Sequence, residues 1–264
     1  MTDELAFKEE AAAEYDRAMS NTSAHFLPFL LRAASLAPGQ TVLDVASGTG
    51  IAAEAALNIV GPQGSVTAVD ISPQMVEQAR CRLAEFPNAS ATVEDGQALS
   101  FSDASFDAVL CSLGLMFFPD PLRGLSEFHR VLRSGGRAAV SVLTAPERSY
   151  NGRINVIVAR HVPKFAEATA RTFALGDPAR LQALFGDAGF TDIETHTEKH
   201  TFVLPSFDTY YSPFERGGAS TGQVLVSLSQ ELRLAIREEM RRDLGDTGGP
   251  VEIEMEIRFA SGRR

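Results

Sequence analysis

Cysteine and long apolar runs are scarce in this sequence. Two cysteines, Cys81 and Cys111, among 264 residues indicate a reducing compartment and no disulfide framework. Neither lies in a metal-ligand spacing such as C-x-x-C, so no metal site is expected. No apolar run approaches the ~20 residues that span a bilayer, and the acidic first ten residues lack the apolar segment of a secretory signal. We therefore expect a cytoplasmic protein with no membrane span.

Positive charge is also in short supply. The chain has 24 Lys and Arg against 34 Asp and Glu, a formal net charge of −10, which disfavours a nucleic-acid backbone as a partner. Its 44% hydrophobic content is that of an ordinary soluble protein and not of a disordered one. The length suits one α/β domain with insertions, or one domain plus a cap. The oligomeric state stays open.

The stretch 42–50, VLDVASGTG, carries the clearest functional signal. Its apolar first half predicts a buried strand, and residues 47–50 form a loop with almost no side-chain bulk. An Ala- and Leu-rich helix is expected to follow over residues 51–60. A strand, a tight glycine loop and a helix together are typical of a nucleotide-binding corner, because glycine lets a ligand approach the backbone and the helix N-terminus offers unpaired N–H groups.

Asp44 decides which nucleotide this corner favours. Gly48, Gly50 and Ala53 fit the dinucleotide-binding fingerprint, and Asp70 lies where a ribose-binding acid is expected. A dinucleotide, however, brings a pyrophosphate to the corner, and the Asp44 carboxylate would repel it. S-adenosylmethionine brings an ammonium group instead, which Asp44 could pair. The sequence thus favours the methyl donor over NAD.

Strands and helices are expected to alternate along the first half of the chain. Further helices are predicted over residues 4–19, 25–36, 73–85 and 121–132, and strands over residues 41–45, 65–69, 89–93, 106–111 and 137–143. The almost wholly apolar strand at 106–111 is typical of a central parallel strand. The alternation predicts a doubly wound parallel sheet.

The chain resembles the class I S-adenosylmethionine-dependent methyltransferases in four segments that follow in order: VLDVASGTG, VTAVDISPQMVEQAR, VEDGQALSFSDASFDAVLCSLGLMFF and VLRSGGRAAVSVL. It is most similar to the group of ubiquinone- and menaquinone-biosynthesis enzymes and related small-molecule methyltransferases. The resemblance covers residues 15–145 and is weak beyond them. It implies an α/β fold with a Rossmann-like, doubly wound seven-stranded sheet, mostly parallel with an antiparallel last strand, with N-terminal helices and a helical cap.

The resemblance also implies the residues that hold S-adenosylmethionine and release S-adenosylhomocysteine. The methionine end would contact Asp44, Ala46, Gly48 and Gly50, and Asp70 would hold the ribose hydroxyls. The remaining contacts would be Ile71, Met75, Asp95 and Gly96 around the adenine, Ser112 and Leu113 near the sulfonium, and Tyr15 closing over the donor. Each position also has a structural explanation: Asp44 could cap a turn, Met75 could fill the core and Tyr15 could simply pack.

The stretch 115–118, LMFF, contains no histidine, whereas many relatives have a histidine pair there. A base at the methyl group is therefore doubtful, and the weak catalytic candidates are His25, Tyr150 and His161. Methyl transfer relieves positive charge, so positioning in a dry pocket can supply most of the rate effect. The apolar stretch suits an aromatic or otherwise apolar small-molecule acceptor, or is plain core. Acceptor contacts are assigned to Met116, Phe117, Tyr150, Asn151, Tyr210 and Tyr211.

Residues 146–264 are expected to complete the sheet and to build a cap over the acceptor. The pattern predicts helices over 178–188 and 223–244, a sixth strand over 191–203, and a seventh strand over 251–260, where apolar and polar residues alternate. The expected organisation is N-terminal helices over 1–36, a donor-binding core over 37–204, a cap over 205–249 and a last strand over 250–264, in one structural domain.

Two other functions fit the same sheet, because fold does not fix function. One is a non-catalytic protein that binds S-adenosylmethionine, which would leave every acceptor unmethylated. The other is an NAD(P)-dependent oxidoreductase, which would bind the dinucleotide and not the methyl donor. The sequence identifies neither the acceptor nor whether O, N, C or S is methylated.

Overall fold

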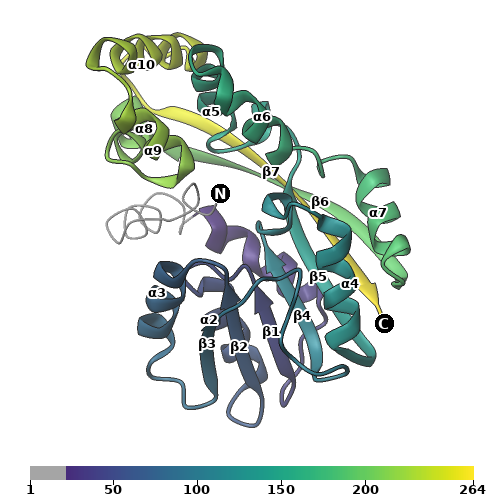
Figure 1. Ribbon diagram of the computed structural model, residues 1–264. Coiled ribbons are helices and arrows are strands. Elements are labelled where there is room, and N and C mark those ends of the chain that lie inside the picture. The colour runs from purple at the N-terminus through teal and green to yellow at the C-terminus, as the bar shows by residue number, and fades with distance from the viewer. Residues whose placement is uncertain (1–21) are drawn as a thin grey trace.

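A computed structural model describes residues 22–264 of the protein (Figure 1). The expected helix over residues 4–19 and Tyr15 lie outside the described residues. Seven strands form one sheet: β1 (Thr41–Val45), β2 (Ser65–Asp70), β3 (Ala89–Val93), β4 (Phe106–Ser112), β5 (Leu132–Leu143), β6 (Thr191–Leu204) and β7 (Val251–Arg263). Residues 22–33 form a helix before β1. The helices that follow are α2 (Ile51–Val60), α3 (Pro73–Leu83), α4 (Pro121–Val131), α5 (Gly152–His161), α6 (Pro163–Thr172), α7 (Pro178–Asp187), α8 (Phe207–Glu215), α9 (Ala219–Ser227) and α10 (Gln230–Leu244), with short 3-10 turns η1 (Leu115–Phe117) and η2 (Pro146–Arg148).

The strands are ordered β3-β2-β1-β4-β5-β7-β6. The first five are parallel, and β7 lies antiparallel between β5 and β6. This confirms the expected seven-stranded, doubly wound sheet. Because the strand order reverses between β1 and β4, the carboxyl ends of these two strands form the position where such sheets bind ligands.

Local sequence signals explain where α3 and α4 begin. Ser72 caps α3 by accepting a hydrogen bond from the Met75 N–H, and Asp120 does the same for α4 through the Arg123 N–H. A proline follows each cap as the first helical residue, where its missing N–H has no partner to lose. Both helix starts agree with the sequence-based expectation.

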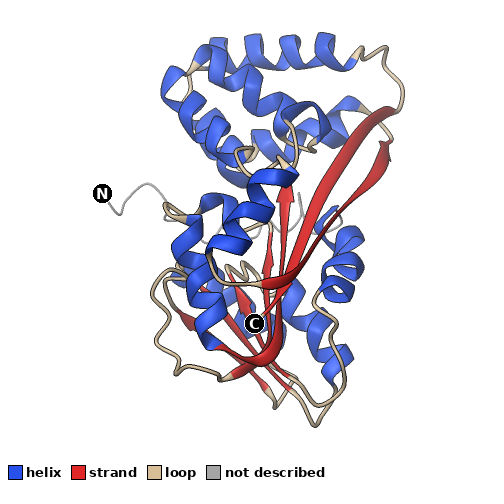
Figure 2. Ribbon diagram, turned by 90° about the vertical axis from the view of Figure 1, so that its right-hand side faces the viewer, coloured by secondary structure: helices blue, strands red, loops and turns tan. Residues whose placement is uncertain are grey.

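The strands β6 and β7 continue past the rest of the sheet as a two-stranded ribbon. The pairing of β7 with β5 ends at Ile257 opposite Leu143, whereas its pairing with β6 runs on to Val251 opposite Leu204. Helices α5, α6, α8, α9 and α10, here called the cap helices, lie along this extension, above the carboxyl ends of the parallel strands (Figures 1 and 2). The ribbon thus carries the cap helices over the ligand-binding edge.

The structure corrects the expected helix over residues 223–244. Two helices, α9 and α10, replace it, because Leu228 is extended and the Ser229 hydroxyl accepts a hydrogen bond from the Leu232 N–H. A serine in this role starts a new helix instead of continuing the old one. Helices α5, α6 and α8 were not anticipated. The cap boundary predicted at residue 205 stays a prediction. Helix α5, which precedes that boundary in the chain, packs against α9 and α10.

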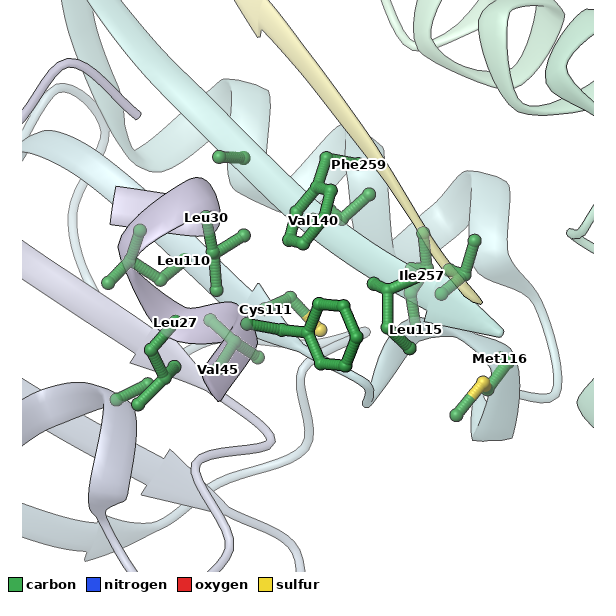
Figure 3. Close-up of a cluster of buried hydrophobic side chains, with 14 of the residues drawn as sticks. Leu27, Leu30, Val45, Leu110, Cys111, Leu115, Met116, Val140, Ile257 and Phe259 are labelled. Atoms are coloured by element: carbon green, nitrogen blue, oxygen red, sulfur yellow. The ribbon is translucent and has the colours of Figure 1, made fainter. Parts of the chain in front are cut away.

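The core joins the helix at residues 22–33 to the central strands. Leu27 and Leu30 of that helix lie in one cluster with Val45 of β1, Cys111 of β4 and Phe259 of β7 (Figure 3). All five are buried. Within residues 22–264, no helix combines the length and apolar character needed to cross a bilayer.

Candidate functional site

Asp44 is a fully buried acidic residue. It lies near the carboxyl end of β1 between Ala68 of β2 and Leu110 of β4, and neither of its carboxylate oxygens has a hydrogen-bond partner among the described residues. Burial raises the pKa of Asp44 to about 8, with a smaller contribution from the nearby Asp70 carboxylate and against the opposing effect of the Ala53 backbone N–H. A buried carboxyl group in this state is expensive unless a cation or hydrogen-bond donor satisfies it.

Ser47 adds a second unsatisfied group to the same corner. Its hydroxyl oxygen is buried and likewise has no hydrogen-bond partner within the described part of the chain. Sequence reasoning treated Ser47 only as a small loop residue, and its burial could not be read from composition. Asp44 and Ser47, which lie three positions apart in the chain, therefore contribute three oxygens that have no partner within residues 22–264. This polar, unsatisfied corner fits the ammonium end of S-adenosylmethionine.

The loop backbone adopts conformations that favour glycine. Gly48 and Gly50 have φ values of 55° and 85°, and Ala46 also lies in the left-handed region at 55°. A left-handed alanine is strained, because its Cβ approaches the following carbonyl. A Cβ on Gly114 would lie 2.5 Å from the Ala46 Cβ. The segment after β4 is thus packed directly on the glycine loop, a contact that the sequence did not indicate.

Asp70 organises the loop from the end of β2. One carboxylate oxygen accepts a hydrogen bond from the Gly48 N–H at 2.9 Å, and the other accepts one from the Ser72 N–H at 2.9 Å. Burial raises the pKa of Asp70, while these backbone hydrogen bonds oppose the rise. Each oxygen keeps a further lone pair for a ribose hydroxyl. Next to it, the Ile71 side chain is 59% exposed, whereas Met75 is buried in α3.

Gly96 is fixed in place by aromatic packing. A Cβ at Gly96 would meet the Phe118 ring at 2.5 Å and Val45 at 2.8 Å, and a Cβ at Gly124 would also meet that ring at 2.5 Å. Phe118 therefore packs between two glycines and connects the loop after β3 to α4. The neighbouring Asp95 is exposed, and its carboxylate accepts a hydrogen bond from the Gln97 N–H at 2.9 Å.

The segment after β4 divides into core and surface. Leu115 and Met116 are buried, whereas the Phe117 side chain is 59% exposed, and α6 lies against η1 here. The Leu113 N–H donates to the Ser141 hydroxyl at 3.0 Å while Leu113 itself has a φ of 53°. Strained residues of this kind gather at functional sites. Ser112, the last residue of β4, is half-buried.

The three weak catalytic candidates lie apart from one another. The His25 ring stacks on His200 of β6 with 3.8 Å between centroids, and burial together with His200 lowers the pKa of His25. The His161 Nε2 is 2.9 Å from the Glu239 carboxylate of α10. Tyr150 is buried, which raises its pKa to about 12. None of these contacts joins a candidate base to the glycine loop.

Four of the six predicted acceptor contacts lie in or just before the cap helices, whereas Met116 and Phe117 lie in η1. The Tyr210 hydroxyl donates to the Tyr150 carbonyl oxygen at 2.8 Å, and their rings lie 5.3 Å apart. Asn151 precedes α5 and accepts a hydrogen bond from the Ser149 hydroxyl at 3.2 Å. Tyr211 stacks on Phe207 at 5.2 Å. Tyr210 and Tyr211 are almost fully buried, so these residues hold the cap helices together.

Comparisons with known proteins agree with this geometry. Residues 42–136 match the family model described as a methyltransferase domain. The demethylmenaquinone methyltransferase of Staphylococcus epidermidis is 34% identical over 167 residues, which cover 59% of this chain and 69% of that protein.

Two solved structures share the fold. A proposed methyltransferase of Bacillus halodurans has a TM-score of 0.61 at 22% identity, covering 90% of this chain and 97% of that chain. The phosphoethanolamine N-methyltransferase 2 of Haemonchus contortus, in complex with phosphomonomethylethanolamine and S-adenosylhomocysteine, has a TM-score of 0.63 at 17% identity, covering 99% and 58%. The chain therefore belongs to the class I S-adenosylmethionine-dependent methyltransferases, in the group that includes the menaquinone-biosynthesis enzymes.

Proposed function

We propose that this methyltransferase acts on a small, mainly apolar acceptor with an aromatic or enolic hydroxyl group. The observation that carries the proposal is the segment that follows β4. Residues 113–118, LGLMFF, contain no ionisable side chain, and Phe117 presents a large apolar surface beside α6. The relative from Staphylococcus epidermidis, whose name specifies a demethylmenaquinone, supports an acceptor of the same general chemistry.

The glycine loop at residues 47–50, together with Asp44 and Asp70, is here called the donor corner. Its residues would hold S-adenosylmethionine in a fixed orientation. Asp44 would pair the ammonium group, Asp70 would accept hydrogen bonds from the ribose, and the loop at 47–50 would supply backbone N–H groups. The bound donor supplies a methyl group on a positively charged sulfur. The apolar side chains around Leu113 and Phe117 would exclude water from that charge, which strengthens electrostatic interactions in the site.

The hydroxyl group of the proposed acceptor is acidic enough to lose its proton without a base from the protein. A base is required only where the nucleophile must lose a proton during attack. His25 is committed to His200 and His161 to Glu239, so an acceptor whose ring stabilises its own anion fits this site better than an aliphatic alcohol. Positioning would then supply most of the catalytic effect.

An acceptor screen tests the proposal. The purified full-length chain would be incubated with methyl-labelled S-adenosylmethionine and a matched panel: a naphthohydroquinone, a simple phenol, an aliphatic alcohol and phosphoethanolamine. We expect label in the two aromatic hydroxyl compounds, more in the larger one. Preferential methylation of phosphoethanolamine, or no transfer to any aromatic hydroxyl while the donor binds, would overturn the proposed acceptor class.

A pair of variants assigns the effect to the apolar segment. Phe117→Ser should raise KM for the naphthohydroquinone by about tenfold or more, because the bound acceptor would cover the exposed ring, and burying an aromatic side chain contributes on the order of 1.5–3 kcal/mol. The affinity for S-adenosylhomocysteine should stay the same. Val203→Ser, which changes a similarly exposed apolar residue on the ribbon, is the control and should leave KM unchanged.

A further inference from the structure

Helix α3 lies across the back of the glycine loop. A Cβ on Gly50 would be 3.1 Å from the Ala79 Cβ, so the loop and the helix are in close contact. One turn further along α3, the Arg82 Nε donates to the Thr49 carbonyl oxygen at 2.8 Å. The Arg82 Nη1 donates to the Glu54 carboxylate of α2 at 3.1 Å. One side chain thus joins three segments around the loop.

Most of the hydrogen bonds of the glycine loop involve its backbone groups. Among them, the Thr49 carbonyl oxygen accepts a hydrogen bond from Arg82. The Ser47 N–H donates to the Val69 carbonyl and the Gly50 N–H donates to the Ser47 carbonyl, both at 3.0 Å. Asp70 accepts from Gly48. Two glycines in left-handed conformations leave the free loop many alternative shapes. A charge-assisted hydrogen bond to the carbonyl between them restricts the loop to one shape.

We propose that Arg82 is a positioning residue for the methionine end of the methyl donor. It fixes the glycine loop before the donor arrives, which reduces the conformational entropy that binding must remove. Arg82 is not a contact of the donor. Its charge is paired with Glu54, so it does not oppose the ammonium group at Asp44. A planar guanidinium can serve a carbonyl and a carboxylate at once, which a lysine ammonium does less well.

The inference concerns the methyl donor and is independent of the proposed acceptor. Its test is calorimetric titration with two ligands, S-adenosylhomocysteine and 5′-methylthioadenosine, which shares the adenosine and sulfur but lacks the amino acid end. In Arg82→Met, S-adenosylhomocysteine should bind about tenfold more weakly, the size expected for a lost charge-assisted hydrogen bond. Binding of 5′-methylthioadenosine should change by less than about twofold.

Arg80→Met is the matched control. Arg80 lies on the same helix, donates to the Ala91 carbonyl at 3.0 Å and pairs with Glu77 at 3.4 Å, away from the loop. It should leave both affinities unchanged. Equal weakening of both ligands by Arg82→Met would mean that Arg82 only supports the fold, and no weakening of either would mean that it has no part in binding; each result would overturn the proposal.

A second measurement needs no ligand. Backbone hydrogen exchange of residues 46–50 should be faster in Arg82→Met than in the unchanged protein, and unaltered in Arg80→Met, at equal global stability. Unchanged exchange in this segment would also overturn the proposal. Arg82→Lys should show intermediate exchange, because one ammonium keeps the charge but cannot hold both partners in the same geometry.

Discussion

The donor corner and the cap helices differ in how many of their buried polar groups have hydrogen-bond partners. In the donor corner, Asp44 and Ser47 keep three unpaired oxygens among the described residues. In the cap, the Tyr210 hydroxyl donates to the Tyr150 carbonyl. At the base of the ribbon, the buried Glu256 pairs with Lys199 at 2.9 Å and Arg148 at 3.1 Å.

The difference distinguishes a ligand site from a structural element. The cap leaves two buried nitrogens, of Gln223 and Arg233, without partners in the described structure, but no carboxylate. Leaving a potential charge unpaired costs more stability than leaving a neutral amide unpaired. We infer that a bound cation supplies the compensating interaction at Asp44, whereas the cap helices leave no buried carboxylate without a partner among the described residues.

The largest expected effect tests the donor corner directly. Asp44→Asn keeps the shape of the side chain and removes the charge that we propose to pair the ammonium group. Affinity for S-adenosylhomocysteine should fall by about 30-fold or more, since losing one partner of a buried charge pair costs at least about 2 kcal/mol. Calorimetric titration measures this. Unchanged affinity would contradict the assignment of Asp44, and Glu256→Gln at the ribbon is the control that should leave it unaltered.

Sequence patterns anticipated the donor corner because its signals are local. The strand, glycines and helix over residues 41–60, and the acid that ends β2, are adjacent or spaced by a regular βαβ unit. What could not be anticipated depends on contacts between distant segments. Arg82 reaches Thr49 across 33 residues, and Gly114 packs on Ala46. The burial of Ser47 likewise depends on the surrounding fold and cannot be read from its own identity.

The cap was less predictable for a related reason. The alternating pattern of β7 indicated its strand and its buried apolar positions correctly, but it did not indicate the burial of Glu256. Helices α5 and α6, in contrast, are held by residues from α10 and η1, as in the contacts of Arg160 and His161 with the Glu239 carboxylate. Local propensity is weak evidence for such segments, because tertiary packing supplies most helical stability.

The pH dependence of donor binding tests the role of the buried Asp44 carboxyl group. Burial raises the pKa of Asp44 to about 8, so below that pH the ligand-free protein holds a protonated Asp44, whereas the ammonium group binds the ionised form. Affinity for S-adenosylhomocysteine should therefore rise as pH increases, by about tenfold per unit below about pH 8, and level off above it.

Stability should change in the opposite direction. An unfolded Asp44 ionises near 3.8, so its contribution to the stability of the ligand-free protein falls as pH rises from there to about 8, where the folded group ionises. Thermal unfolding of the wild type and Asp44→Asn across this range measures the difference. If the two proteins showed parallel pH profiles for both unfolding and donor binding, the raised pKa would be wrong.

Two glycine substitutions test whether the donor corner and the cap helices affect donor binding independently. Gly114→Ala would place a Cβ 2.5 Å from the Ala46 Cβ, and Gly152→Ala would place one against the Pro146 carbonyl oxygen. Each should lower the free energy of unfolding by about 1–3 kcal/mol. Only Gly114→Ala should also weaken S-adenosylhomocysteine binding, by about tenfold, because it displaces the glycine loop. Equal weakening by Gly152→Ala would show that the cap helices and the donor corner are coupled.

The smallest expected effect compares strain in the two regions. Ala46 in the donor corner and Ala219 at the start of α9 both lie in the left-handed region, with φ of 55° and 57°. Replacing either by glycine relieves about 1–2 kcal/mol of strain, and the greater freedom of glycine in the unfolded chain offsets about 0.4–1 kcal/mol of it. Both variants should therefore unfold at slightly higher temperature.

Donor affinity then separates the two alanines. The Ala46 Cβ contacts the segment at Gly114, so Ala46→Gly should loosen the loop and weaken S-adenosylhomocysteine binding slightly while raising stability. Ala219→Gly should raise stability without changing that affinity. Strain that helps to shape a ligand site trades stability for function, whereas strain in a structural segment does not. If both variants bound the ligand as the unchanged protein does, the strain at Ala46 would have no role in the site.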